Sequence, residues 1–293
     1  MKSFRKDGKN HMKYSKENSE KTGYLEQEFR LFHIKDQTKR SFSYHYHDFH
    51  KVVVFLSGKA AYHIEGKSYY LKPWDILLVD RHAIHKPEID FSVPYERFIL
   101  WIRDDIRYSE LNRCFQKAND RSFNLIRLDS QTQERLKQLL YELEAALKDP
   151  EFGSELLSEG IFTQFMVYIN RIFLKKQYIF DSHSYTCDSQ IEDLLRYINQ
   201  NLTEDLSIEV LAKKYYLSKY HMMRKFKEET GYTIHNYIVS KRLLAARTRI
   251  SEGMPVLKAA QISGFSDYTT FSRAYKKQFG TAPSQNTGPV SLS

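Results

Sequence analysis

The spacing of apolar residues divides the chain into a strand-rich half and a helix-rich half. Between Phe29 and Trp101, apolar and polar residues alternate over short stretches, as in Ala60–Ile64, which the turn Glu65-Gly66-Lys67 follows. Alternation with a period of two is typical of strands that bury one face. Many short strands with closely spaced turns predict a small antiparallel barrel or sandwich.

Beyond residue 104 the apolar spacing becomes that of helices. Leu136, Leu140, Leu143 and Leu147 fall on one helical stripe, and a second helix is expected over residues 154–175. This second helix carries more apolar side chains than one buried stripe requires. Packing within one chain and additional packing against a second chain both explain the excess, and the latter predicts a homodimer.

Composition then sets the boundaries of these regions. The lysine-rich start of the chain is too polar to form a core and is expected to be a flexible tail. The segment 182–189 is short, polar and poor in helix formers, which is typical of a linker between domains. The predicted regions are a tail over 1–24, a barrel over 25–104, a helical connector and dimerisation region over 105–181, the linker 182–189, and a helical domain over 190–293.

The helical domain contains an internal repeat. The segment Leu211–Gly231 aligns with Ala259–Gly280. In this alignment Ser218 matches Ser266, at a spacing of 48 residues; after a one-residue insertion, Phe226 matches Tyr275, at a spacing of 49 residues. In each copy a short helix leads to a serine placed to cap a longer basic helix, which ends at glycine. This pattern predicts two helix-turn-helix units joined by a helix over residues 234–250.

The charge of the chain is concentrated in this repeat. Fourteen basic and five acidic residues lie between Ser207 and Gln285, a surplus equal to the net charge of +9 of the whole chain. A basic module beside a neutral one suggests a polyanionic partner such as nucleic acid. On charge alone, a solvated lysine-rich surface explains the surplus equally well.

The second copy of the repeat carries a family resemblance. The pattern from Gly264 to Ser284, Gly-Phe-Ser-Asp-x-x-x-Phe-Ser-Arg-x-Tyr-Lys-Lys-x-Phe-Gly-x-x-Pro-Ser, resembles the signature of the AraC/XylS transcription regulators. The stretch 241–246 resembles the linker helix of that family. The sequence departs from the family at Ala259, where isoleucine is usual, and lacks the aromatic residue that normally follows Pro-Ser.

The resemblance implies which side chains touch DNA. A helix fits the major groove, and residues of its first turns reach the base edges. In the two recognition helices Met222 and Phe226, and Phe271 and Tyr275, are expected to face the core. Matching the motif places base contacts at Tyr220, Met223, Arg224, Tyr268, Thr269 and Arg273. For Arg224 and Arg273, a salt bridge with a nearby acid is the alternative role.

Seven of the eleven histidines lie in the strand-rich half, between His33 and His85. His45-Tyr46-His47, followed by strands, a Pro73-Trp74-Asp75 turn and His85, resembles the cupin barrel. Cupins that bind metal usually place a glutamate where this chain has His50 or Lys51, so no metal is expected, although three neutral imidazoles suit zinc. Hydrogen-bonded barrel residues are the plainest role for these histidines. The resemblance also implies a ligand pocket in the barrel, with candidates His45, His47, His85, Tyr62, Trp74 and Trp101.

Together these features predict an α+β protein of two domains, with a cupin-like antiparallel β-barrel plus helices followed by an all-α double helix-turn-helix. The predicted function is a ligand-responsive bacterial transcription regulator, with promoter DNA, a small-molecule effector and a second copy of the chain as partners, and RNA polymerase as a further one. A saccharide is the favoured effector. The alternative is a cupin-type metal-dependent enzyme with an accessory DNA-binding domain. No enzymatic activity and no cofactor are expected.

The remaining sequence features bear on location. Only two cysteines, Cys114 and Cys187, are present, which is too few for a disulfide framework and fits a reducing cytoplasm. No apolar run approaches the roughly 18 residues of a membrane-spanning helix, and the polar start of the chain does not resemble a secretory signal. We therefore expect a cytoplasmic protein with no membrane partner.

Overall fold

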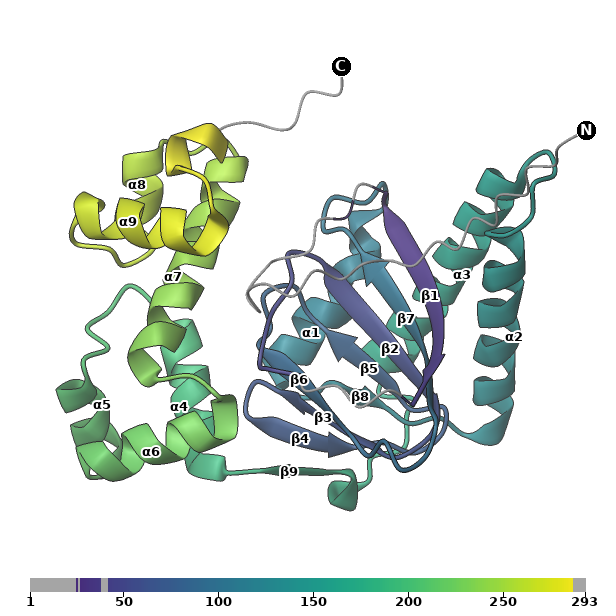
Figure 1. Ribbon diagram of the computed structural model, residues 1–293, viewed down its shortest axis with the longest axis horizontal. Helices are drawn as coiled ribbons and strands as arrows, with labels where there is room; N and C mark the ends of the chain where they lie inside the picture. Colours follow the sequence, from purple (N-terminus) through teal and green to yellow (C-terminus); the bar gives the residue numbers. More distant parts are fainter. Residues whose placement is uncertain (1–24, 26, 38–41, 287–293) are drawn as a thin grey trace, which may run out of the picture.

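The computed structural model describes residues 25, 27–37 and 42–286, so the tail expected over residues 1–24 lies outside the described residues. Antiparallel sheets and the helices α1 to α3 form the N-terminal half of the described residues, and the helices α4 to α9 follow in the C-terminal half (Figure 1). The predicted α+β class with two differently built domains is confirmed.

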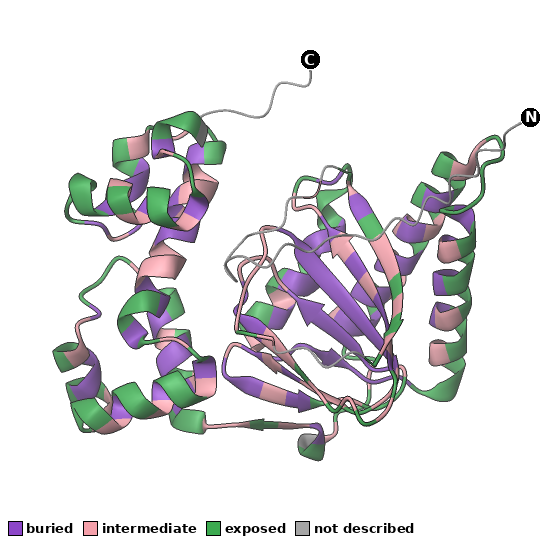
Figure 2. Ribbon diagram, viewed as in Figure 1, coloured by how far each residue is buried: buried purple, intermediate pink, exposed green. Residues whose placement is uncertain are grey.

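Two antiparallel sheets form the N-terminal half. The larger is ordered β1 (Phe29–Asp36), β7 (Tyr95–Ile102), β2 (His50–Ser57), β5 (Ile76–Val79) and β8 (Leu125–Ile126). The smaller is ordered β6 (His85–Ile89), β3 (Ala60–Ile64), β4 (Lys67–Tyr70) and β9 (Tyr185–Cys187). Nearly all of β2 and all of β5 are buried (Figure 2), so the centre of the larger sheet is covered on both faces.

Three helices accompany the sheets, namely α1 (Arg113–Arg121), α2 (Ser130–Ala146) and α3 (Ser154–Leu174). Helices α2 and α3 lie on the side away from the C-terminal half (Figure 1), whereas the end of α1 lines the cleft that faces this half. In α3, Phe165 and Ile169 are fully buried within the chain, whereas Leu156 is 73% and Leu157 54% exposed. Most of the apolar excess of α3 is therefore used inside the chain, and its first turn remains uncovered. No helix among the described residues is both long and apolar enough to cross a membrane.

The segment 182–189, expected to be an irregular linker, is partly regular. A short 3-10 helix at Ser182–Ser184 leads into β9, whose Cys187 lies opposite Lys67 of β4. The sequence did not indicate this strand because it is only three residues long and takes its regularity from the backbone of β4. Strand β9 therefore ties the start of the C-terminal half to the smaller sheet.

The C-terminal half contains two helical units with separate cores. The first is built from α4 (Ser189–Gln200), α5 (Ile208–Tyr215) and α6 (Lys219–Thr230), and the second from α8 (Val256–Gln261) and α9 (Tyr268–Phe279). The long helix α7 (Ile234–Ser251) contributes to both cores, and a 3-10 helix at Pro283–Asn286 follows α9. The buried side chains include the predicted pairs Met222 and Phe226 in α6, and Phe271 and Tyr275 in α9.

The start of α9 corrects one sequence assignment. Ser218 caps α6 by accepting a hydrogen bond from the amide of His221 at 3.2 Å, as predicted. In the second unit the predicted cap Ser266 is wrong, because the side chain of Asp267 accepts from the amide of Thr270 at 2.6 Å. A carboxylate is an equally good cap and also favours the positive end of the helix dipole. The one-residue insertion therefore precedes the cap.

Candidate functional site

The predicted DNA-contacting residues lie on exposed faces of two equivalent helices. Tyr220 is 75% exposed, and Met223 and Tyr268 are more than two-fifths exposed. Arg224, Thr269 and Arg273 are exposed as well. With the caps at positions 218 and 267, Tyr220 corresponds to Thr269 and Arg224 to Arg273. The repeat thus exposes side chains at two equivalent positions of each helix, with arginine at the second position in both, opposite the buried side chains.

The two arginines differ in their surroundings. Arg224 forms an ion pair with Glu228, with 3.1 Å between Nη1 and Oε1, and both side chains are about half exposed. An exposed pair at this helical spacing contributes only about 0.3–0.5 kcal/mol, so Arg224 exchanges it easily for another partner. Arg273 has no ion pair among the described residues; hydrogen bonds from Thr270 and the charge of Arg273 lower the pKa of Asp267.

The candidate effector site is a cluster of three imidazoles. The ring nitrogens of His45, His47 and His85 lie within 4.8 Å of one another. His45 is not part of a regular strand but pairs with His85 through an isolated bridge, with reciprocal backbone hydrogen bonds of 3.0 and 2.9 Å. The rings of Tyr62 and His85 stack at 5.8 Å, and Trp101 lies 6.2 Å from His47. Five of the six predicted ligand residues are therefore brought together.

Trp74, the sixth, lies elsewhere. Its amide donates to the carbonyl of Phe55, and its ring contacts Tyr141 of α2 at 6.4 Å. Phe55 is four residues along β2 from Lys51, which contacts the cluster, and this distance in a strand is about 13 Å. The turn Pro73-Trp74-Asp75, which resembles the cupin motif, therefore places Trp74 near the end of β2 that is far from Lys51 and the cluster.

Backbone carbonyls fix the protonation of the cluster. Nδ1 of His45 lies 2.8 Å from the carbonyl of Ser43, and Nδ1 of His85 lies 2.8 Å from the carbonyl of Ala83. Each Nδ1 therefore carries the proton, and each Nε2 keeps its lone pair. Burial, followed by the nearby charge of Lys51, lowers the pKa of His45 to about 4 and that of His47 to about 2. The imidazoles are neutral at physiological pH.

Lys51 contacts the histidine cluster through His85. It projects from β2, is buried, and places Nζ 2.9 Å from Nε2 of His85 and 3.4 Å from the hydroxyl of Tyr62. The lone pair of His85 thus accepts a hydrogen bond from Lys51 and is not available to an ion. Among the described residues, the group that could hold a metal consists of three histidines without a carboxylate. Three imidazoles can hold zinc, but here the hydrogen bond from Lys51 to His85 and the nearby ammonium charge both disfavour a cation.

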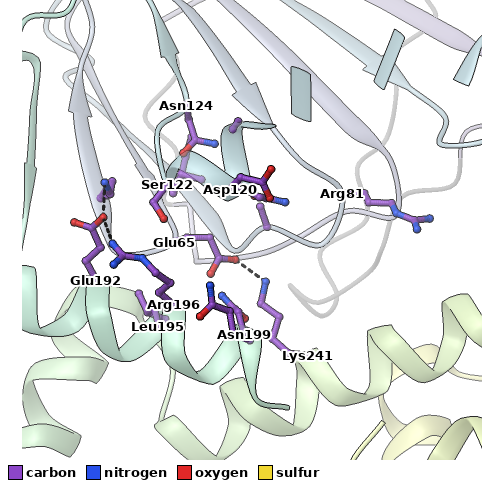
Figure 3. A pocket seen from close by; sticks show the side chains of 16 residues that line it. Glu65, Arg81, Asp120, Ser122, Asn124, Glu192, Leu195, Arg196, Asn199 and Lys241 are labelled. Atoms are coloured by element: carbon purple, nitrogen blue, oxygen red, sulfur yellow. Dashed lines mark hydrogen bonds and ion pairs between the residues drawn. The ribbon is translucent and has the colours of Figure 1, made fainter. Parts of the chain in front are cut away.

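A cleft of about 370 Å³ lies between the two halves of the molecule (Figure 3). Glu65, in the turn between β3 and β4, accepts hydrogen bonds from Lys241 Nζ at 2.7 Å, from the Tyr237 hydroxyl and from the amide of Ile84. Lys67 pairs with Glu192 of α4 across the same cleft at 2.9 Å. Sequence reasoning identified Glu65 only as a turn residue, because its partners in α7 lie more than 170 residues away.

The segment 44–48 joins the histidine cluster to the C-terminal helices. His45 and His47 belong to the cluster, whereas the alternate residues Tyr44, Tyr46 and Asp48 contact the C-terminal helices. The Tyr44 hydroxyl donates to the carbonyl of Glu229 at 3.1 Å, and Tyr46 packs on the core of the second unit. Asp48 pairs with Arg247 of α7 at 3.0 Å. Because alternate residues of an extended segment point to opposite sides, one short segment contacts both sites.

Each half of the chain matches a known domain family. Residues 31–166 match the AraC-like ligand binding domain, and residues 211–287 match a helix-turn-helix domain. The chain is 26% identical to the probable transcriptional regulator LumQ of Photobacterium leiognathi over 84% of this chain and 92% of the relative. It is 24% identical to the transcriptional activator RhaS of Escherichia fergusonii, over 83% of this chain and 86% of the relative.

Solved structures that match the chain include the apo form of a ToxT variant from Vibrio cholerae. That chain is 16% identical, with a TM-score of 0.37 over 88% of this chain and 96% of ToxT. The C-terminal domain of AraT from Geobacillus stearothermophilus is 21% identical, with a TM-score of 0.34 over 36% of this chain and 93% of that domain.

A ligand-binding domain followed by two helix-turn-helix units defines a DNA-binding transcription regulator under small-molecule control. The chain belongs to the AraC family of transcription regulators, and the expected family and domain types are confirmed. The relatives are named as transcriptional regulators and not as enzymes, which agrees with the predicted regulator rather than with the alternative of a metal-dependent enzyme.

Proposed function

We propose that this regulator binds a small polar effector at the histidine cluster and reads two adjacent DNA segments with α6 and α9. The observation that carries the proposal is the repeated exposed surface of the two helices. In this proposal the base contacts come from Tyr220, Met223, Arg224, Tyr268, Thr269 and Arg273.

Helix α7 sets the spacing of the two recognition helices. Its 18 residues span about 27 Å at 1.5 Å per residue. Successive major-groove segments on one face of DNA lie about 34 Å apart. The two units therefore suit neighbouring grooves of one duplex, with arginine pairing to guanine and tyrosine or methionine contacting thymine methyl groups or sugars.

A saccharide is the favoured effector class. Tyr62 and Trp101 offer aromatic faces beside His45, His47 and His85, which supply hydrogen-bonding nitrogens. Small-molecule sites commonly combine apolar or aromatic walls with a few polar groups that fix the orientation of the ligand. Such walls suit the apolar faces of a sugar ring, and the imidazoles suit its hydroxyl groups.

The segment 44–48 provides the route from effector to DNA-binding half. An effector that moves His45 or His47 also moves Tyr44, Tyr46 and Asp48, which contact the C-terminal helices. Control requires that the effector bind two arrangements of the halves with different affinity. In the structure described here the halves are held together through this segment and through Glu65.

Dimerisation is proposed through the start of α3 and the loop before it. Phe152, Leu156 and Leu157 are exposed, Leu156 by 73%. Contiguous exposed apolar side chains commonly mark interaction surfaces. Light scattering of the intact protein tests this, with Leu156→Glu expected to yield monomers.

The finer aspects of the setting are proposals too. The relatives RhaS and RhaR are named as transcriptional activators, which supports activation and contact with RNA polymerase. DNA as partner, and two free cysteines, support a cytoplasmic location. The regions 25–104, 105–181 and 190–293 are proposed as sensor, connector and DNA-binding domain, with 182–189 joining the last two.

Footprinting on the promoter DNA beside the gene tests the proposal. We expect the wild type to protect two adjacent major-groove segments, and the double variant Arg224→Ala/Arg273→Ala to protect neither. Lys258→Ala, which removes an exposed charge from α8 rather than from a recognition helix, is the matched control. Absence of protection by the wild type at low salt would refute DNA recognition at this promoter, because electrostatic contacts are strongest there.

A further inference from the structure

We propose that Lys51 anchors a carboxylate group, so that the effector is a hydroxy acid, such as a sugar acid, rather than a neutral sugar. This inference rests on the proposed function, because it takes the histidine cluster as the effector site. It adds the charge and the hydrogen-bonding pattern of the molecule that would bind there.

The charge of Lys51 is not balanced within the protein. Among the described residues, no aspartate or glutamate forms a salt bridge with Lys51, although its side chain is buried. Arg97, the cation that acts on Lys51, is paired with Asp36 at 3.0 Å. Burial, together with the charge of Arg97, lowers the pKa of Lys51 to about 7. A buried ammonium without a counter-ion is costly, and an anionic ligand would remove that cost.

The hydrogen-bond donors around Lys51 are also incompletely used. An ammonium group has three N–H donors, and Lys51 directs two of them to His85 and Tyr62. The indole nitrogen of Trp101, which can only donate, is buried without a partner among the described residues, as is Nδ1 of His47. The third N–H of Lys51 and the indole N–H of Trp101 are donors that lack acceptors, and they match a carboxylate, which has two oxygens and several lone pairs.

One acceptor in the cluster indicates the rest of the ligand. Nδ1 of His45 carries the proton because it faces the carbonyl of Ser43, so Nε2 is an acceptor directed to the cluster. A neutral acceptor beside a carboxylate site suits a hydroxyl group on the carbon next to the carboxylate. The arrangement therefore selects a hydroxy acid over both a simple fatty acid and a neutral sugar.

The members of the cluster differ in exposure. His45, His47 and Trp101 are partly exposed, whereas Lys51 and His85 are buried. A ligand entering past the partly exposed residues would meet Lys51 with its charged end first. Its remaining atoms would then lie against His45 and Trp101, close to the segment 44–48 that contacts the C-terminal helices.

Fluorescence of Trp101 provides a direct test. The chain has two tryptophans, so Trp74→Phe leaves Trp101 as the only one. In this background we would titrate matched pairs of small molecules, namely acetate and acetamide, glycolate and glycolamide, and glucuronate and glucose. We expect each acid to bind at least about tenfold more tightly than its neutral partner, and glycolate more tightly than acetate.

Lys51→Met keeps the length of the side chain and removes the charge. In this variant the preference for acids should disappear, whereas Lys59→Met, at an exposed lysine in the turn between β2 and β3, should keep it. Equal binding of acids and neutral partners by the wild type would overturn the inference. So would an unchanged preference in Lys51→Met, or stoichiometric zinc binding at the histidines that no acid displaces.

Two further measurements keep these outcomes separate. The preference of the wild type for acids needs no variant, so the test stands even if Lys51→Met folds poorly. Gel retardation of promoter DNA with the same preparation, without any added acid, reports DNA binding independently. If the protein retards the DNA but shows no preference for acids, only the effector class is overturned. If it does not retard the DNA at all, the proposed function itself is refuted.

Discussion

The two helix-turn-helix units share one architecture but differ in how they are attached to the sensor. The core of the first unit includes the buried Ile84 from the N-terminal half and is covered by Tyr44. The second unit meets that half mainly through Tyr46 and through the ion pair between Asp48 and Arg247. Units with the same fold thus differ in their dependence on the sensor, and the first is the better placed to respond to an effector.

Glu65→Ala should have the largest effect on this difference. It removes the carboxylate that binds Lys241 and Tyr237 and leaves the ammonium of Lys241 with the carbonyl of His82 and the ring of Tyr237, neither of which is charged. Loss of one partner from a partly buried charged pair costs about 3 kcal/mol. Hydrogen exchange measured by mass spectrometry should accelerate in α6 and in the segment 44–48, but not in α9.

Glu134→Ala is the matched control for this substitution, because Glu134 is an exposed carboxylate whose ion pair, with Lys137, is also exposed. It should leave the exchange pattern unchanged. Equal acceleration in α6 and α9 after Glu65→Ala would show that both units depend on the sensor to the same degree, and the comparison drawn above would fail.

The glycines that end the recognition helices offer a second, matched test. Gly231 and Gly280 both have a left-handed backbone, with φ of 74° and 77°. A methyl group at Gly231 would overlap the ring of Tyr44, whereas one at Gly280 meets no atom within 4 Å. Gly280→Ala should cost about 1 kcal/mol, from the backbone alone. Gly231→Ala should cost about 2–3 kcal/mol in the free energy of unfolding, because Tyr44 must also move.

Chemical denaturation of the intact protein measures both variants. If Tyr44→Ala removes the difference between the two glycine variants, the excess arises from the contact with the sensor. Equal costs at the two glycines in the presence of Tyr44 would mean that the first unit is not held as the structure indicates.

Substituting the recognition arginines Arg224 and Arg273 one at a time compares the contributions of the two units to DNA binding. We expect Arg224→Ala and Arg273→Ala each to weaken specific binding by about 1–3 kcal/mol and to relax base preference at one position. Arg224 must first leave Glu228, so its loss should matter less, by about 0.3–0.5 kcal/mol. Glu228→Gln should remove that difference, as measured by titration with fluorescent operator DNA. Unchanged affinity and selectivity would remove an arginine from the set of base contacts.

The sequence predicted those parts of the fold that depend on local patterns. The apolar spacing of Met222 and Phe226 identified the buried face of α6, and the internal repeat predicted the two helix-turn-helix units in the region that also holds the charge surplus. Contacts between residues far apart in sequence left no such pattern. Glu65 and Lys241, 176 residues apart, and the pairing of β9 with β4 were therefore missed. Trp74 was misplaced because motif spacing does not record which end of a strand a turn occupies.

The helix caps give the smallest expected difference between the units, and one that depends on pH. Ser218 has no charge to titrate, whereas hydrogen bonds from Thr270 lower the pKa of Asp267 below its usual value of 3.8. A carboxyl group whose pKa is lowered by folding stabilises the fold above the unfolded pKa, and this contribution is lost as the pH falls through the folded pKa.

Asp267→Asn keeps a good cap without a charge. The melting temperature of the wild type should therefore fall slightly more than that of Asp267→Asn between pH 5 and about pH 3. Ser218→Ala, which costs about 1 kcal/mol at every pH, serves as the pH-independent reference. If the two curves run parallel, Asp267 caps α9 only as a hydrogen-bond acceptor, and the units do not differ in this respect.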